Sequence, residues 1–532
     1  MPHLSRLKKS AAATTIVAAL ALAGCSGEST ASPTPGASGA GEPVEGGDLT
    51  IVSLGEMTCV DPWQTVIRVA LQWHRQVVDS LIYEDREGAF HPWLAESYEV
   101  NDDATQFTFT LRDDVTFSDG SALDAETVKA NLDALDADPR YTIAQGFLSS
   151  YAGTEVVDEH TAVVSFDEPN APFLYGVSTP NMGIISTASA ALDAGARCQG
   201  DASGSGPFVL DGFRSGEQAV LARNDDYAWA PEGLENKGPA YLDTITVNQV
   251  ADQTVIGQTG LAGDAQIVHG AADPFVPQLE QAGWQRFNEP DPASVSSFIF
   301  YPGNGIAGSD EAVRQAFNLA LDREELVAAT ASAIYSEPSG VLNTAHPYFV
   351  DQSDLLEQDV DAANELLDDD GWEVGSDGIR TRDGERLSIE AIGNAAIGDA
   401  LAVAAQQLEE VGIELTIRPV TFTEEAALRA EGRLQVRVNQ QTGAEPTVLP
   451  LLFDGNLPEG MEDLVAAQAS TVDVETRREA AAEMESLLLE DGWLAPLWQS
   501  VNQPVYAPEV HGVVRDVGGL FMLGQVWLDP QD

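Results

Sequence analysis

The chain has 532 residues, which is too long for a single hydrophobic core, so at least two lobes are expected. Hydrophobic residues make up 44% of the chain and charged residues 21%, as is usual for a folded globular protein. The formal net charge of −59 repels phosphate backbones, so no nucleic-acid partner is expected. We interpret this charge as a well-solvated acidic surface, as in salt-tolerant exported proteins; an acidic site for cationic ligands is the alternative.

The first 24 residues have the pattern of an export signal. Basic residues at positions 6, 8 and 9 precede an apolar stretch over residues 11–23, which is too short to span a bilayer as a mature helix. Leu22–Cys25 then fits the lipobox of bacterial lipoproteins, in which the Cys thiol receives a diacylglycerol and the chain is cut just before it. An ordinary secretory signal with a chance cysteine is the alternative. We expect residues 1–24 to be a lipoprotein signal peptide and Cys25 to be the lipid attachment site.

Residues 26–47 contain almost no large apolar side chains and cannot bury enough surface to fold. A flexible chain of this length reaches roughly 25 Å r.m.s. by random-coil scaling. Residues 25–47 are therefore expected to be a lipid-anchored tether that holds a soluble body clear of the membrane.

Periodicity predicts an α/β body from residue 48 onward. Residues 48–54 predict a first strand, and the alternation of apolar residues over 106–117 predicts a half-buried hairpin. Asp124 is a candidate N-cap for the helix that follows.

Cys59 and Cys198 are the two cysteines of this body. In an exported protein two cysteines more often pair than stay free, so they are a disulfide candidate; two buried free thiols are the alternative. Closing so long a loop adds up to roughly 5 kcal/mol in the chain-entropy model.

Gly303, Gly305 and Gly308 have the GxGxxG spacing of a dinucleotide-binding turn, between a strand-like run and a helix pattern. Such a site also needs an acidic residue about twenty positions on, at the end of a second strand. The acidic residues at positions 322, 324 and 325 lie instead within or at the end of the helix pattern. We interpret the glycines as a turn, with Ser309 or Asp310 as the cap of the next helix, and expect no cofactor.

Helical and turn signals continue through the second half of the body. Helices are predicted over residues 311–328 and 361–370, the second with Asp361 as its N-cap. Asp383–Gly384 predicts the type I′ turn of a hairpin. A helix that ends at Gly412 lies between two strand-like runs, which predicts a βαβ crossover and a partly parallel sheet.

Five stretches, in order along the body, resemble the family 5 solute-binding proteins of ABC importers, the extracellular group that binds oligopeptides, dipeptides and nickel. They are residues 92–128, residues 204–213 (GSGPFVLDGF), residues 313–327 (VRQAFNLALDREELV), residues 402–420 and residues 493–513. The resemblance implies an α/β, two-lobed fold of the type II periplasmic-binding-protein kind, with mixed sheets and a hinge. It implies lobe I over residues 48–290, lobe II over residues 291–495 and a return to lobe I over residues 496–532.

The function implied by this resemblance is that of an extracellular receptor. Such a protein captures a solute in the cleft between its lobes, here a peptide-like solute, and delivers it to an ABC permease that an ATPase subunit drives. We expect a monomer without a cofactor, anchored by lipid to the outer face of the cytoplasmic membrane.

Gln440, Gln441 and Thr442 lie in a stretch that resembles the peptide-binding segment of this family. In its peptide binders an Asp of this segment pairs with the α-ammonium group of the peptide, and here Thr442 takes that position. Burying an ammonium group without a carboxylate is costly, which disfavours a free α-peptide. A blocked peptide, a sugar or a metal chelate is permitted, and a solvated turn without ligand contact is the alternative.

The resemblance adds four further candidates for ligand contact. Gln64 and Arg68 follow the first strand, and Arg68 offers a bidentate fork to a ligand carboxylate; a surface ion pair is its alternative role. Trp498 and Gln499 lie near the return to lobe I, and core packing is the alternative for the Trp498 ring.

The sequence contains no HExxH, CxxC or GxSxG motif, and its seven histidines are scattered. No metal site and no enzyme activity are therefore expected. A glycoside hydrolase needs only two carboxylates and is a less favoured alternative, because nothing among 85 acidic residues identifies the pair. A structural or adhesive surface lipoprotein is a third class, which the five family-like stretches disfavour.

Overall fold

The computed structural model describes residues 41–55, 57–64, 68–287, 290–330, 332, 334–393, 398–500 and 504–530. The predicted signal peptide, Cys25 and the predicted tether as far as residue 40 lie outside these residues. Every element below belongs to one compact unit, Pro43–Asp532. Within the described residues no helix is both long and apolar enough to cross a bilayer.

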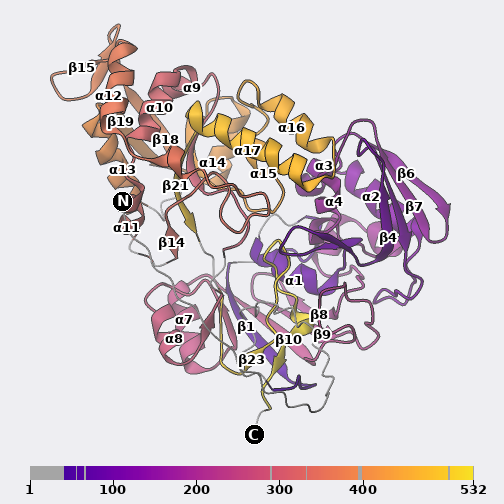
Figure 1. Ribbon diagram of the computed structural model, residues 1–532. Helices are drawn as coiled ribbons and strands as arrows, with labels where there is room; N and C mark the ends of the chain where they lie inside the picture. Colours follow the sequence, from indigo (N-terminus) through magenta and orange to yellow (C-terminus); the bar gives the residue numbers. More distant parts are fainter. Residues whose placement is uncertain are drawn as a thin grey trace, which may run out of the picture. The chain divides into compact units, whose positions relative to one another are not determined.

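A seven-stranded mixed sheet is built around the first predicted strand, β1 (Asp48–Leu54). β1 pairs in parallel with β10 (Thr244–Val250) and β11 (Ile267–His269) (Figure 1). The order β12-β22-β11-β1-β10-β9-β8 is completed by β8 (Phe208–Arg214), β9 (Gln218–Arg223), β12 (Gln285–Arg286) and β22 (Val505–Tyr506). Because β22 comes from the end of the chain, the C-terminal segment returns to the sheet that β1 begins.

Three helices cover the seven-stranded sheet: α1 (Arg68–Val77), α7 (Gln253–Ala262) and α8 (Val276–Gln281). Alternate residues of the strands, such as Leu49 and Ile51, have no exposed surface. The period-two pattern of the sequence therefore places one side of these strands in the core.

A four-stranded antiparallel sheet has the order β4-β5-β7-β6, with β4 (Ala95–Val100), β5 (Gln106–Leu111), β6 (Tyr151–Asp158) and β7 (Thr161–Phe166). The predicted hairpin over residues 106–117 is wrong, since β5 pairs with β4 and β7 instead of with the residues that follow it. β5 thus lies between a strand that directly precedes it and a strand much later in the chain, and its Phe107 and Phe109 side chains are completely buried.

Helix α2 (Ala125–Ala137) packs on this sheet and begins where the sequence predicts. The Asp124 carboxylate accepts a hydrogen bond of 2.7 Å from the Thr127 backbone N–H, so Asp124 is confirmed as the N-cap. The short elements nearby are β2 (Ile82–Glu84), β3 (Phe90–Pro92), α3 (Thr142–Phe147), α4 (Phe173–Gly176), α5 (Thr187–Ala190) and α6 (Ala194–Cys198).

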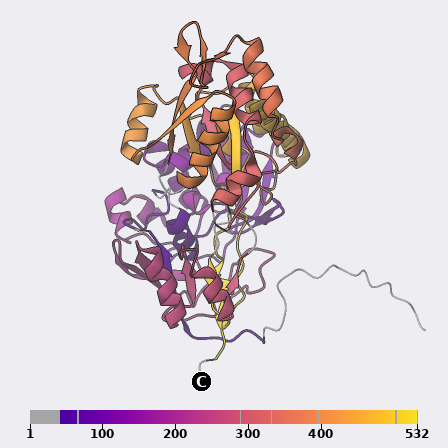
Figure 2. The same ribbon diagram turned by 90° about the vertical axis from the view of Figure 1, so that its left-hand side faces the viewer.

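A six-stranded mixed sheet with the order β14-β21-β13-β20-β18-β19 comes from the second half of the chain. Its strands are β13 (Ser296–Phe300), β14 (Tyr335–Ser336), β18 (Ser388–Gly393), β19 (Glu414–Pro419), β20 (Val436–Asn439) and β21 (Leu494–Ser500), the last drawn yellow in Figure 2. β18 and β19 run parallel and are joined by α13 (Gly398–Glu410), which confirms the predicted βαβ unit.

Further helices lie around the six-stranded sheet: α9 (Gly305–Ser309), α10 (Glu311–Leu319), α11 (Arg323–Ala329), α12 (Val360–Asp369), α14 (Phe422–Ala430), α15 (Val448–Leu451), α16 (Met461–Ala469) and α17 (Val474–Glu490). The predicted helix over 311–328 is thus two helices. The N-cap of α12 is Asp359, whose carboxylate accepts from the Ala362 N–H at 2.8 Å, so the predicted cap Asp361 is wrong. Both are acidic residues near the helix start, and only the backbone geometry distinguishes them.

The turn predicted at Asp383–Gly384 is confirmed. The predicted glycine turn is confirmed only in part, since Gly303 lies in a turn whereas Gly305 and Gly308 lie in the short helix α9. Asp383 and Gly384 have φ angles of 53° and 85°, and they join β16 (Arg380–Arg382) to β17 (Glu385–Arg386). At the GxGxxG stretch a side chain at Gly308 would lie 2.2 Å from the carbonyl oxygen of Tyr301, so the glycine is required for close backbone packing. The Asp310 carboxylate accepts from the Val313 N–H at 3.2 Å and caps α10.

We call the part built on the seven-stranded and four-stranded sheets lobe I, and the part built on the six-stranded sheet lobe II. The predicted boundary between residues 495 and 496 falls inside β21, whose residues up to position 500 pair within lobe II. The chain returns to lobe I at β22, and β23 (Val510–His511) and β24 (Trp527–Leu528) follow. The limits of the lobes at residues 48–290, 291–495 and 496–532 stay predictions.

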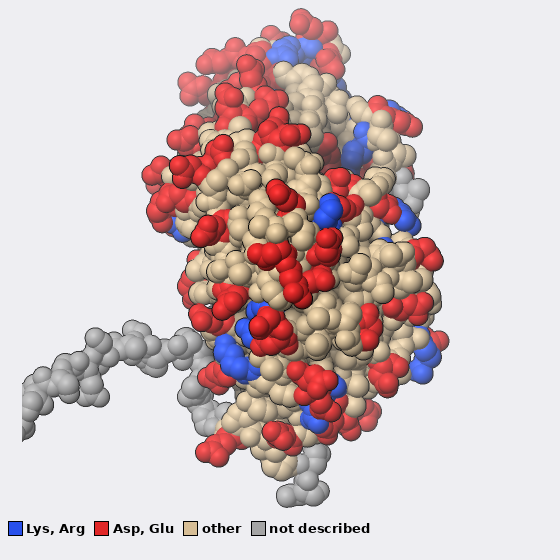
Figure 3. Space-filling model, turned by 90° about the vertical axis from the view of Figure 1, so that its right-hand side faces the viewer, with Lys and Arg blue, Asp and Glu red and all other residues tan. Residues whose placement is uncertain are grey.

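The surface carries the acidic excess of the composition. On the face that Figure 3 shows, Asp and Glu side chains are spread throughout and Lys and Arg are scattered among them. Acidic and basic residues are therefore intermixed on this face and do not form separate charged patches.

Candidate functional site

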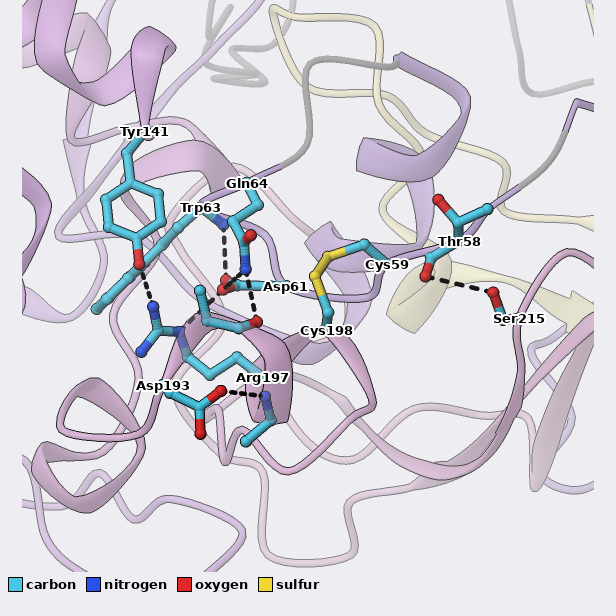
Figure 4. Close-up of a disulfide and its surroundings, with 12 residues drawn as sticks. Thr58, Cys59, Asp61, Trp63, Gln64, Tyr141, Asp193, Arg197, Cys198 and Ser215 are labelled. Atoms are coloured by element: carbon cyan, nitrogen blue, oxygen red, sulfur yellow. Dashed lines mark hydrogen bonds and ion pairs between the residues drawn. A yellow bond between two sulfur atoms is a disulfide. The ribbon is translucent and has the colours of Figure 1, made fainter. Parts of the chain in front are cut away.

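The segment after β1 is fastened to α6 by a disulfide between Cys59 and Cys198 (Figure 4). Beside it, the Asp61 carboxylate and the Arg197 guanidinium form a buried ion pair of 2.9 Å. Gln64 donates from Nε2 to Asp61 Oδ2 at 2.7 Å and to the Ala194 carbonyl at 2.8 Å. A covalent bond and charged contacts thus fix the position of this segment as far as Gln64.

Arg68 is the first residue of α1, and its side chain lies outside the described part of the chain. Residues 65–67, between Gln64 and α1, lie outside it as well. The contact between Arg68 and a ligand carboxylate therefore stays a prediction.

In lobe II the stretch after β20 continues the pairing of the sheet. The Gln441 backbone N–H donates to Ser294 Oγ at 2.8 Å, and the Ser294 N–H donates to the Gln441 carbonyl at 2.8 Å. Ser296 Oγ donates to Gln440 Oε1 at 2.8 Å, and Thr442 forms a β-bridge with Ala293. Thr442 is exposed while the two glutamines are half-buried, so the backbone of this stretch is fixed and the threonine side chain is open.

The residues that follow Thr442 contact lobe I. The Ala444 backbone N–H donates to the Tyr175 hydroxyl oxygen at 3.2 Å, and these two residues form a small apolar cluster with Val517. A second contact between the lobes is the hydrogen bond of 2.8 Å from the Ala171 N–H to the Ala469 carbonyl. The family-like stretch therefore lies where the two lobes meet.

A buried ion pair also occurs at this meeting point. Arg477 of α17 pairs with Glu445, and it donates to the Tyr348 hydroxyl at 2.9 Å and to Gln468 Oε1 at 2.8 Å. Glu84 of β2 lies near this pair: burial raises the pKa of its carboxyl group well above the usual range, and the charge of Glu445 raises it further. An acidic side chain of lobe I thus faces an ion pair of lobe II.

Trp498 and Gln499 lie on β21 and have different roles. The Trp498 side chain is 1% exposed and its ring packs edge-on to Tyr335, with 5.9 Å between the ring centroids. It forms part of the core of lobe II, which was its alternative role. Gln499 is half-buried, and its Oε1 accepts a hydrogen bond of 3.4 Å from the Thr344 N–H.

Nothing in the sequence points to Tyr175, Glu84 and Arg477 as residues of this place. Tyr175 lies in a four-residue helix with no motif around it, and Arg477 is 32 positions from its partner Glu445. In a chain with 85 acidic residues, one acid–base pair at such a separation gives no sequence signal.

The described residues contain no group of three or more His, Cys, Asp or Glu side chains arranged to hold a metal ion.

Residues 89–455 match the model of the bacterial extracellular solute-binding proteins, family 5 middle region. The chain belongs to this family. It is a family of binding proteins. Four of the five family-like stretches lie within the matched region, and the fifth, residues 493–513, lies beyond its end.

Two curated relatives illustrate the similarity. Protein XP55 of Streptomyces lividans is 28% identical over 367 residues, which cover 65% of this chain and 62% of XP55. The match thus spans less than two thirds of that relative. The oligopeptide-binding protein AppA of Bacillus subtilis is 25% identical over 428 residues, which cover 77% of this chain and 75% of AppA.

Solved structures show the fold. NikA from Brucella suis in complex with Fe(III)-EDTA has a TM-score of 0.75 at 23% identity and covers 90% of this chain and 100% of its own. AppA from Bacillus subtilis in complex with a nonapeptide has a TM-score of 0.73 at 18% identity, with coverage of 92% and 100%. The chain therefore has the two-lobed, mixed α/β fold of the periplasmic binding proteins, as predicted.

Proposed function

We propose that this protein is the extracytoplasmic solute receptor of an ABC importer, which captures a peptide-like solute between its lobes and delivers it to a membrane permease and its ATPase. The observation that carries the proposal is the position of the stretch from Gln440 to Thr442. It is held rigidly by Ser294 and Ser296 and leaves Thr442 exposed where lobe II meets lobe I. We assign no catalytic step to the protein.

Capture requires that a solute favours one arrangement of the lobes over another. The chain passes from lobe I to lobe II between β12 and β13 and returns between β21 and β22, and these two crossings form the proposed hinge. A solute that contacts both lobes at once stabilises their closed arrangement, which the permease then recognises. The contact between Tyr175 and Ala444 is one that such a closed arrangement includes.

The chemistry of the stretch limits the class of solute. Thr442 offers a neutral hydroxyl group, and Gln440 uses its carbonyl oxygen to accept from Ser296. A solute with a free ammonium group would find no carboxylate at Thr442, so we propose a peptide-like solute whose amine is blocked or bound elsewhere. A sugar or a metal chelate on the same fold is the second candidate, favoured by the same neutral position.

Gln64 and Arg68 are proposed to face the solute from lobe I, and Gln441 and Gln499 from lobe II. The disulfide and the buried pair of Asp61 and Arg197 support this proposal, because they hold the stretch from Cys59 to Gln64 in one conformation. A preorganised segment loses less conformational freedom when a solute binds.

Native mass spectrometry of protein purified without refolding tests the proposed function. We expect a 1:1 complex whose released solute has the mass of a small peptide-like molecule. That solute, added back at about 100 times its Kd, should stabilise the protein by about 2.7 kcal/mol. The proposal would be contradicted if the purified protein carried no solute and if its melting temperature stayed unchanged with a broad panel of peptides, sugars and chelates.

We further propose that a lipid on Cys25 anchors the protein to the outer face of the cytoplasmic membrane, with residues 25–47 as tether. Replacing Cys25→Ala should release the protein to the medium or leave its signal uncut. Cell fractionation with an intact-mass measurement distinguishes these forms, and unchanged membrane association of the variant would contradict the anchor.

A further inference from the structure

Lobe I encloses a cavity of about 190 Å³ between α1 and the strands β8 and β9. Its inner end is formed by the buried side chains of Phe208, Ala219 and Leu221. Ser118 and Asp201 line its outer end and are exposed to solvent. The cavity therefore combines an apolar interior with an entrance, and every residue that lines it belongs to lobe I.

Two consecutive residues of α1 bring unpartnered polar atoms to the lining. Trp73 and His74 are 2% and 1% exposed. Within the described residues Trp73 Nε1 and both ring nitrogens of His74 have no partner at hydrogen-bond geometry. The backbone of Cys59 lies near enough to raise the pKa of His74, against the larger effect of burial. Buried polar groups in proteins are nearly always hydrogen-bonded, so these atoms point to a partner that the chain itself does not supply.

The chemistry of that partner follows from His74. Burial lowers the pKa of this histidine to about 3, so at neutral pH its ring carries one N–H donor and one acceptor nitrogen and no charge. A hydroxyl group can bond to whichever of the two ring nitrogens faces the cavity, because it can either donate or accept. An anionic ligand is disfavoured, because no Lys or Arg side chain lines the cavity. The net charge of −59 of the whole chain would repel it as well.

The size of the cavity limits the rest of the molecule. An apolar cavity of roughly 150 Å³ in a protein interior takes up benzene. At about 190 Å³, the cavity in lobe I has room for one such ring and a small substituent. Phe208 and Leu221 offer the apolar contacts that a ring requires.

We propose that this cavity is a second binding site, for a small neutral aromatic molecule with one hydroxyl group, distinct from the site where the lobes meet. The ring lies among the apolar residues of β8 and β9, and the hydroxyl group bonds to His74. Met57 and Val60 also line the cavity on either side of Cys59, so an occupant packs against the segment that the disulfide holds. Occupancy is expected to stabilise lobe I whether or not a solute is bound between the lobes.

Phenol is the probe, with benzene and benzoate as matched comparisons. Titration of the intact protein should give a saturable rise in melting temperature with phenol, a smaller rise with benzene and none with benzoate. His74→Leu keeps the bulk and removes both nitrogens, so phenol should bind about tenfold more weakly while benzene binds at least as well. Ala219→Leu fills the cavity and should abolish the response to both.

Ala222→Leu is the control, because Ala222 lies on the same strand and outside the cavity lining. It should respond to phenol as the wild type does. A crystal of the wild-type protein soaked in phenol gives a test that needs no variant, and it should show the ring beside His74. Water alone in the soaked cavity, or an equal phenol response in Ala219→Leu, would overturn the proposal.

Discussion

Glu485 shows how a single buried carboxyl group supports the proposed site. It lies on α17, and its Oε2 accepts hydrogen bonds of 2.9 Å from the N–H groups of Val341 and Leu342. Leu342 forms a β-bridge with Ser294, and Ser294 in turn bonds to Gln441. The position of the candidate stretch thus depends on a buried side chain outside that stretch.

The titration of Glu485 makes stability depend on pH. Burial raises its pKa from 4.5 to about 8, so between these values the folded state holds a proton that the unfolded state has lost. Its contribution to stability is complete below about pH 4.5 and is lost as the pH rises through 8. In this window the free energy of unfolding should fall by at most about 1.4 kcal/mol per pH unit.

Glu485→Gln should remove this pH dependence, because the amide keeps an acceptor oxygen and does not ionise. Urea unfolding of the wild type and the variant between pH 5 and pH 8 measures the difference in slope. Glu483→Gln is the matched control, an exposed glutamate on the same helix. Equal slopes in the wild type and Glu485→Gln would contradict the assignment.

At the scale of elements, local signals were sufficient in some places and not in others. The βαβ unit of β18, α13 and β19 and the turn at Asp383 could be predicted, since each depends on neighbouring residues. The pairing of β5 with β7 could not, because β7 lies about 50 positions away and the pairing depends on which aromatic rings become buried. Pairing between strands so far apart in the chain cannot be predicted from local sequence patterns.

The site divides in the same way. The stretch at Gln440 was found because it resembles a family motif, whereas Tyr175, Glu84 and Arg477 come from three separate elements that only the fold brings together. Trp498 had two predicted roles, and its complete burial beside Tyr335 identifies it as core.

The disulfide acts on residues 57–64, which lie between β1 and α1 and form no helix or strand. Cys59 and Cys198 are 139 positions apart, and the chain-entropy model gives about 5 kcal/mol for a loop of that size. Cys59→Ser together with Cys198→Ser should therefore lower the free energy of unfolding by up to that amount. Adding a reductant to the wild type should give the same loss, and the double variant should not respond to it. Equal stability in urea of the oxidised wild type and the double variant would contradict this role.

At the scale of the whole molecule, the main electrostatic feature is the net charge of −59. Figure 3 shows how densely acidic side chains occur on one face. Self-repulsion of this kind destabilises a compact state. Raising NaCl from about 0.1 M to about 1 M shortens the Debye length from about 10 Å to about 3 Å, so the melting temperature should rise.

Choline chloride at equal ionic strength should give the same rise, since screening does not depend on the identity of the cation. Calorimetry in both salts measures this. A melting temperature that does not change with salt concentration would contradict the role of self-repulsion. A rise in NaCl but not in choline chloride would favour an acidic site for cations.

The central claim concerns both lobes: a solute binds where the Gln440 stretch of lobe II meets lobe I. Affinity of the Thr442→Asp variant for short peptides with a free α-amino group, measured by calorimetry, tests it most directly. The added carboxylate should bind the ammonium group and raise this affinity about tenfold or more, while N-acetylated forms of the same peptides gain nothing. Thr416→Asp, on the exposed edge strand β19, should change neither affinity. Unchanged affinity of Thr442→Asp for every peptide, or an equal gain in Thr416→Asp, would contradict the account.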